Sequence, residues 1–145
     1  MAPILRLYED VLPSDGGAVS LPALPRLIFV VHGAVTIADR SLHDDEAWHG
    51  DGAAVLTAGK EGTTLWRWEL AGGKAADGAA TAKGVRSLEK LSARLDTLPQ
   101  CRLLLRGDSV AFPPGGCAYL HRHQGPGIRC QIEGGIRWVR HVLVL

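Results

Sequence analysis

Residues 112–138 read FPPGGCAYLHRHQGPGIRCQIEGGIRW and carry the clearest structural and chemical signal in the sequence. A Pro-Pro-Gly-Gly turn precedes a short apolar run, and His121 and His123 follow it. Side chains alternate between the two faces of a strand, so these two imidazoles point the same way if the segment is extended. The pattern predicts a β-strand that carries half of a metal site, whose other ligands must come from elsewhere in the chain.

The overall composition is that of an ordinary globular chain. Its 145 residues are enough for one domain with a hydrophobic core. A net charge of +1 without a basic run argues against nucleic-acid or anionic-membrane partners. No apolar run approaches the ~20 residues of a membrane helix, and no signal-peptide pattern is evident, so a cytoplasmic location is expected. Buried free thiols in a reducing compartment are predicted for the three widely spaced cysteines, Cys101, Cys117 and Cys130.

Several segments have the composition of β-strands. Residues 4–8 and 27–37 are rich in aliphatic and β-branched side chains, and Gly33 divides the second segment as a bend would. Residues 53–57 are short and apolar, and residues 58–62 have the composition of a turn. Many short strands joined by Gly- and Pro-rich turns are typical of an all-β protein.

Residues 64–70 alternate strictly between two faces. One face carries Leu65, Arg67 and Glu69, and the other carries Thr64, Trp66, Trp68 and Leu70. The tryptophan face is the apolar one, so it is predicted to pack against the core of a half-buried strand.

The second half of the chain is more varied. Residues 71–84 consist mostly of Gly, Ala, Lys and Asp, which is typical of a flexible linker. Residues 87–98 combine leucines at helical spacing with a context that also suits a strand, and both interpretations remain open. Further strands are predicted at residues 103–105, 109–112 and 139–145.

A weak internal repeat relates the two halves. When Gly33 is aligned with Gly134, apolar residues of one copy fall on apolar residues of the other, and each copy reads strand, glycine turn, strand. The first copy has Ser20 and Pro22 at the positions of the two histidines.

The turn, the His-x-His pair and the closing glycine resemble the first motif of the cupin superfamily. Gly115 lies six residues before His121, as in that motif, and Gly134 matches its final glycine in kind. The motif's glutamate is missing, because its expected places hold Gly127 and Ile128.

A second, weaker resemblance lies earlier in the chain. Residues 50–62 are similar to the second cupin motif, but Gly62 stands where that motif has a metal-binding histidine. The order of the motifs is therefore unusual, as if the end of one cupin were joined to the start of another.

The resemblance implies an antiparallel β-barrel of the jelly-roll type that contains a ligand pocket. We expect a cupin-like half at residues 1–70, a linker at 71–84 and a half with the His-x-His motif at 85–145, together forming one compact domain. The chain is either an abbreviated two-cupin protein, a rearranged single barrel, or a homodimer whose protomers complete each other by strand exchange.

Two functions follow from the resemblance. In one, His121 and His123 hold a divalent transition metal (Fe, Mn, Ni or Zn) for oxygenation or isomerisation of a small polar metabolite. In the other, a degenerate cupin binds a ligand or a second copy of itself without any metal. In either case the residues that we expect around the ligand are Gln124, Tyr119, Trp66 and Trp68, with a packing role for the two tryptophans as the alternative.

Other histidines carry weaker signals. His43 and His49 lie among acidic residues, where we expect a solvated loop and not a cation site. Glu133, His141 and His32 could complete a metal site, although no spacing selects any of them.

Overall fold

The computed structural model describes residues 2–72, 78–96, 98, 101–119, 121, 123 and 125–136. All its regular secondary structure is β, in agreement with the sequence, and the strands form one antiparallel sheet that does not close into a barrel. The strands are β1 (Ile4–Leu12), β2 (Val19–Leu21), β3 (Arg26–Ile37), β4 (Arg40–His43), β5 (Ala47–Gly50), β6 (Ala54–Ala71) and β7 (Arg86–Arg94).

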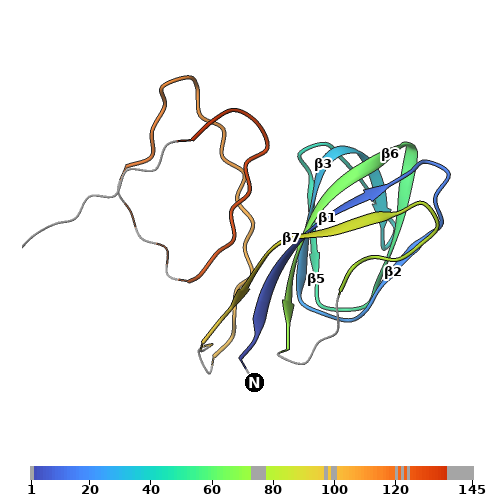
Figure 1. Ribbon diagram of the computed structural model, residues 1–145, viewed down its shortest axis with the longest axis horizontal. Coiled ribbons are helices and arrows are strands. Elements are labelled where there is room, and N and C mark those ends of the chain that lie inside the picture. The colour runs from blue at the N-terminus through green and yellow to red at the C-terminus, as the bar shows by residue number, and fades with distance from the viewer. Residues whose placement is uncertain are drawn as a thin grey trace, which may run out of the picture.

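The sheet is built around the long pair β3 and β6. Its order is β4-β3-β6-β1-β7, with β2 also paired to β6 and β5 also paired to β3 (Figure 1). Each of the two long strands therefore pairs with different neighbours along its length. The first half of β3 pairs with the last part of β6, and its second half pairs with residues 56–58 of β6.

The sheet bends over itself where two glycines meet. Gly33 in β3 and Gly62 in β6 both have positive φ, 88° and 80°, a conformation that side chains with a Cβ rarely adopt. A Cβ on Gly33 would lie 2.3 Å from the carbonyl oxygen of Gly62. The pairing of β3 with β6 shifts register on both sides of Gly33, so the bend expected there from the sequence is confirmed.

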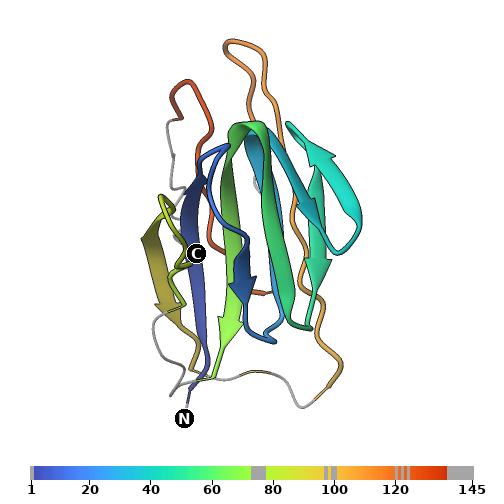
Figure 2. The same cartoon turned by 90° about the vertical axis from the view of Figure 1, so that its right-hand side faces the viewer.

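The hydrophobic core lies between the two halves of the bent sheet, whose backbone Figure 2 shows from the side of β2. One half, formed by β5, β3, β6, β1 and β7, contributes Leu12, Ile28, Val30 and Leu65. The other half, formed by β4, β3, β6 and β2, contributes Leu21, Val35, Ile37, Leu42 and Leu56. Every one of these side chains is at most 3% exposed, so the bend creates a two-layered core from one sheet.

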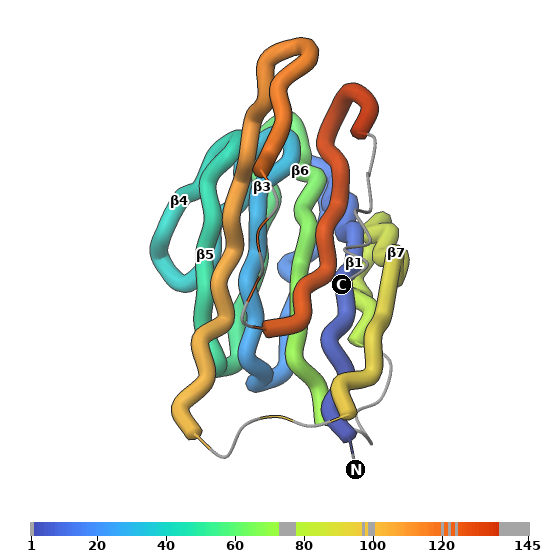
Figure 3. Tube along the Cα trace, turned by 90° about the vertical axis from the view of Figure 1, so that its left-hand side faces the viewer, coloured from blue at the N-terminus to red at the C-terminus, as the bar shows by residue number. Residues whose placement is uncertain are grey.

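The described part of residues 101–136 forms a long irregular segment on the outer face of the first half. Figure 3 shows its orange and red runs crossing the sheet on the side of β3, β5, β6 and β1. A Cβ on Gly107 would lie 2.7 Å from Leu27, and the Trp68 indole donates to the carbonyl of Ile128 at 3.2 Å. The apolar side chains Leu5, Leu7, Phe29 and Trp66 of this face are at most 9% exposed.

The prediction for the faces of residues 64–70 was only partly right, because Trp66 is buried as expected, at 6% exposed, but the opposite face is buried as well. The face with Leu65, Arg67 and Glu69 points into the core and is at most 1% exposed, whereas Trp66 and Trp68 lie on the outer face. Residues 58–62, expected to be a turn, continue strand β6 through the bend at Gly62.

In the second half of the chain, strand is the correct alternative for residues 86–94. Residues 78–85 do not form a free linker, because Ala80 is only 6% exposed and joins the core. Within the described part of residues 101–136 the expected strands are not observed, and residues 139–145 lie outside the described residues.

Candidate functional site

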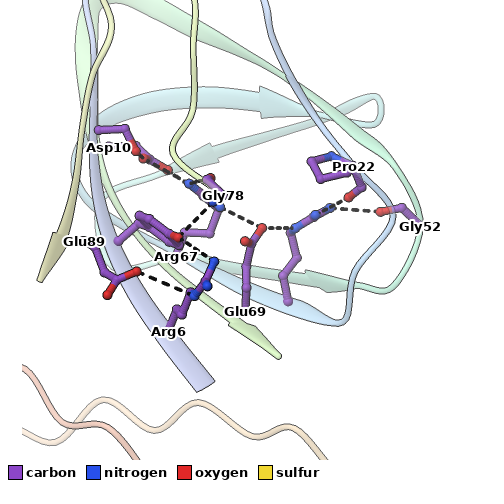
Figure 4. Close-up of polar contacts among 11 residues, drawn as sticks. Arg6, Asp10, Pro22, Gly52, Arg67, Glu69, Gly78 and Glu89 are labelled. Atoms are coloured by element: carbon purple, nitrogen blue, oxygen red, sulfur yellow. Dashed lines mark hydrogen bonds and ion pairs between the residues drawn. The ribbon is translucent and has the colours of Figure 1, made fainter. Parts of the chain in front are cut away.

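Four charged side chains lie in a row inside the bent sheet, and each contacts the next. Asp10 on β1 accepts a hydrogen bond from Arg67 Nε on β6 at 2.6 Å, and Arg26 Nε on β3 donates to Glu69 at 2.9 Å (Figure 4). Arg67 Nη1 lies 2.7 Å from Glu69 Oε1, a contact of opposite charges without hydrogen-bond alignment. The four side chains are at most 1% exposed, and their two positive and two negative charges balance.

The remaining polar atoms of this charged cluster have partners on neighbouring elements. Arg67 donates to the carbonyl of Gly78 at 3.0 Å, and Arg26 donates to the carbonyls of Pro22 and Gly52. The Ser87 hydroxyl donates to Asp10. The cluster therefore connects β1, β3, β6 and β7 with the loops beside them, which is a structural role.

Burial and charge shift two pKa values here in the same direction for different reasons. Burial by itself lowers the pKa of Arg67, but the hydrogen bond and charge of Asp10, together with the charge of Glu69, raise it above its ordinary value. Burial raises the pKa of the Tyr8 hydroxyl, although that oxygen accepts a hydrogen bond from the Gly78 amide at 3.1 Å. Both groups keep their usual protonation at neutral pH.

Two open cavities lie at the bent end of the sheet, away from the charged cluster. The larger, about 720 Å³, is lined by residues 11–13, 32–34, 43–44 and 60–64. The smaller, about 490 Å³, is lined by residues 31–32, 44–45, 64 and 132–133. His32, Asp44 and Thr64 line both cavities, so these residues lie where the two meet.

His32 and Asp44 form the polar centre of this bent-end cleft. Nδ1 of His32 lies 3.4 Å from Asp44 Oδ2, and the Gly33 amide donates to Asp44 Oδ1 at 2.6 Å. Both side chains are exposed, at 83% and 55%. The backbone therefore holds the carboxylate in place, and the imidazole next to it is open to a solute.

The structure places the two predicted metal ligands close together on the surface. Nε2 of His121 lies 2.9 Å from Nε2 of His123, and the Nδ1–H of His121 donates to the Tyr119 carbonyl at 2.7 Å. Two nitrogens bound to one transition metal at ~2.0–2.1 Å lie roughly 3 Å apart, so this spacing suits a shared ion. Among the described residues, however, no group of three or more His, Cys, Asp or Glu side chains could hold a metal.

The other predicted ligand-binding residues are scattered. Trp66 donates to Glu9 on the outer face at 3.2 Å, and Trp68 on the same face contacts residue 128. Tyr119 is 88% exposed, and Gln124 lies outside the described residues. None of the three that are described lines the bent-end cleft.

Sequence reasoning missed the charged cluster and undervalued His32. Arg67 and Glu69 alternate with tryptophans and therefore looked solvent-facing, and the partner Asp10 is 57 residues from Arg67. His32 precedes the bend glycine, and Glu133 occupies the same place before Gly134 in the repeat. Both residues line the smaller cavity, although residues 128–136 form no strands like those of the first copy.

The cysteines are unpaired, as expected, but they are less buried than expected. Cys101 and Cys117 are exposed, and Cys130 is intermediate. Within the described ranges, no helix is long and apolar enough to span a membrane.

No protein-family model, curated protein or solved structure matches this chain.

Proposed function

We propose that this chain is a cupin-like binding module that takes a small polar molecule in the bent-end cleft. The observation that carries the proposal is that His32 and Asp44 line both cavities there. Ligand sites are concave and combine apolar walls with a few fixed polar groups. The cleft has this character: Val11, Leu12 and Pro13 supply apolar wall, and a backbone amide fixes the carboxylate of Asp44.

The packed interior supports binding without metal chemistry as the main function. A cupin of the enzymatic type would hold its metal and substrate inside the barrel. Here the space between the sheet halves contains the hydrophobic core and the charged cluster. A jelly-roll relationship is supported by the bend at Gly33 and Gly62 and by the short strands that flank β3 and β6.

Ligand-observed NMR with pools of small polyols, hydroxy acids and amino acids tests this proposal. We expect at least one compound to bind the wild-type protein and its affinity to fall at least tenfold in His32→Ala. The matched control is His49→Ala, which removes an imidazole outside both cavities. Absence of binders, or equal affinity in His32→Ala, would contradict the proposal.

A second candidate function is metal-dependent oxygenation or isomerisation of a small polar metabolite at His121 and His123. The 2.9 Å spacing of their Nε2 atoms favours it, as does the hydrogen bond that fixes the Nδ1 proton of His121. A divalent transition metal (Fe, Mn, Ni or Zn) bound there would supply Lewis-acid or redox chemistry.

Elemental analysis of protein purified without chelator distinguishes the two functions. The metal hypothesis expects stoichiometric metal in the wild type and in His49→Ala, and its loss in His121→Ala and His123→Ala. Metal that persists in both of these variants would place the ion elsewhere. If the wild-type protein contains no metal, the metal hypothesis is rejected and the binding module remains as the proposed function.

We infer a cytoplasmic location from the sequence pattern alone. Homodimerisation by strand exchange stays a prediction.

A further inference from the structure

The smaller cavity of the bent-end cleft has walls of two kinds. The bend of the sheet and the turn between β4 and β5 supply Val31, His32, Asp44, Asp45 and Thr64. The other wall consists of Ile132 and Glu133, which belong to the irregular segment. One side of the cavity is therefore formed by a part of the chain that lies in no strand.

Backbone hydrogen bonds fix the sheet side of this cavity. The Asp45 amide donates to the carbonyl of Val30 at 3.0 Å, and the Val30 amide donates to the carbonyl of Glu46 at 2.9 Å. Residues 128–133 differ, because no backbone-to-backbone hydrogen bond outside the strands involves them among the described residues. Segments with few backbone hydrogen bonds open locally at a lower free energy than the sheet beside them.

Trp68 holds this segment against the sheet at the end away from the cleft. Its indole Nε1 donates to the carbonyl of Ile128 at 3.2 Å. Ile132 lines the smaller cavity together with Thr64, so residues 128–132 follow β6 from Trp68 to Thr64, as the red run in Figure 3 shows. The indole hydrogen bond therefore fastens a wall whose far end reaches the cleft.

Side chains along the segment alternate between the sheet and the solvent. Ile128 and Cys130 are partly buried, whereas Arg129 and Gln131 are exposed. Neighbouring side chains of an extended chain point to opposite sides, so Cys130 faces the sheet. The reactivity of its thiol thus depends on whether the segment lies on the sheet or is lifted from it.

Glycines lie at both ends of the segment. Gly125 and Gly127 precede it, and Gly134 and Gly135 follow it. Gly134 has a φ of 80°, and at all four positions a Cβ would meet nothing within 4 Å. Glycine adopts backbone angles on both sides of φ = 0 at little cost, so these positions suit hinges.

We propose that residues 128–133 form a hinged strap that closes one side of the bent-end cleft, with the Trp68 hydrogen bond as its latch. When the latch opens, the strap turns on its flanking glycines, and Ile132 and Glu133 leave the smaller cavity. A small molecule then reaches His32 from this side, and closure of the strap slows its release. This role in ligand entry rests on the proposed function of the cleft, whereas the movement is a property of the free protein.

Labelling of Cys130 with iodoacetamide, followed by mass spectrometry, measures strap opening without any ligand. Trp68→Phe removes the N–H donor and keeps an aromatic ring, so Cys130 should react roughly fivefold faster, the factor expected for one hydrogen bond. Trp66→Phe is the matched control, because that indole donates to Glu9 and not to the strap. The Cys130 rate should stay at its wild-type value in this control.

A second thiol tests whether the strap covers the cleft. Val31 is partly buried and lines the smaller cavity but not the larger one. The thiol of Val31→Cys should react several-fold faster when Trp68→Phe is added, and at an unchanged rate when Trp66→Phe is added. Circular dichroism verifies that each variant is folded.

Low concentrations of urea separate strap opening from unfolding. Strap opening exposes little surface, so the labelling rates of both thiols should not depend on urea, whereas labelling through global unfolding would rise steeply with it. The exposed Cys101 and Cys117 serve as internal references, and their rates should be the same in all variants.

Three results would overturn the strap: an unchanged Cys130 rate in Trp68→Phe, an equal increase in Trp66→Phe, or labelling that rises steeply with urea. Faster labelling of Cys130 without faster labelling of Val31→Cys would overturn its role in ligand entry. Absence of binders in the NMR experiment contradicts the proposed function but does not alter these rates, so the two failures are distinguishable.

Discussion

Arg67 is a residue that acts on stability, although it lies away from the bent-end cleft. Its guanidinium contacts Asp10 and Glu69 and lies 4.4 Å from the centre of the Tyr8 ring. Taking such a charge out of water is costly, and only partners in good geometry offset the cost. Removal of one partner therefore costs more than the intact cluster contributes.

Substitution of Arg67 by Met should lower the free energy of unfolding by about 3–5 kcal/mol, because Asp10 loses its cation and Glu69 keeps only Arg26. Urea unfolding followed by circular dichroism measures this change. Lys90→Met is the control: it removes the more exposed ion pair with Glu9 and should cost less than ~1 kcal/mol. Similar losses of unfolding free energy in Arg67→Met and Lys90→Met would show that the charged cluster contributes no more stability than the more exposed ion pair.

Glu9 gives a prediction about pH. Hydrogen bonds from Lys90 and then from Trp66 lower the pKa of its carboxyl below the ordinary value. A carboxyl whose folded pKa is lowered stabilises the protein above its unfolded pKa of about 4.3 and loses that contribution as the pH falls through the folded value.

The stability difference between the wild type and Glu9→Gln should therefore favour the wild type at neutral pH, by up to ~1 kcal/mol, and shrink below about pH 4. Urea unfolding at a series of pH values measures it. If the stability difference between the wild type and Glu9→Gln grows as the pH falls, its sign is opposite to the expected one. The hydrogen bonds assigned to the Glu9 carboxylate would then be wrong.

At the scale of elements, the bend in β3 and β6 decides the fold. It brings the two halves of each strand to opposite sides of one core, and it also opens the cleft beside His32. The bend depends on two glycine conformations and a backbone contact that leaves no room for a side chain.

Gly33→Ala should destabilise the protein by at least ~1–3 kcal/mol, because the positive φ is strained for alanine and its Cβ would clash with the Gly62 carbonyl. Thermal unfolding measures the effect. Gly17→Ala is the matched control, since a Cβ there meets nothing within 4 Å and its φ is not in the positive range. A Gly33 variant as stable as the Gly17 variant would show that the bend tolerates a side chain.

At the scale of the whole molecule, the described part of residues 101–136 lies against the outer face at Leu27 and Trp68. Its own apolar side chains stay largely open to solvent, and Leu104, Val110 and Tyr119 are 83%, 67% and 88% exposed. It contacts the sheet at Gly107, which lies against Leu27.

Gly107→Leu should lift this segment from the sheet and expose Leu7, Phe29 and Trp66. We expect increased binding of the dye ANS and greater quenching of tryptophan fluorescence by acrylamide. Gly127→Leu changes the same segment at a position where a Cβ meets nothing within 4 Å, so both signals should stay at their wild-type level. Equal signals in the two variants would mean that the segment does not cover the face through Gly107.

The sequence by itself determined the local structure. β-branched and alternating residues predicted strands within β1, β3 and β6, and Gly33 predicted the bend, because strand preference and glycine conformation depend on neighbouring residues. The imidazoles of His121 and His123 lie together, but the strand from which their common side was predicted is not observed among the described residues there.

Only the tertiary structure decided which face of β6 is buried and which polar residues share a cleft. An arginine next to tryptophans looks exposed until Asp10, 57 residues away, is seen to neutralise it. A strand-like segment such as residues 103–112 forms no strand unless a partner strand lies beside it. Both outcomes depend on contacts between residues far apart in the chain, and local sequence patterns do not encode them.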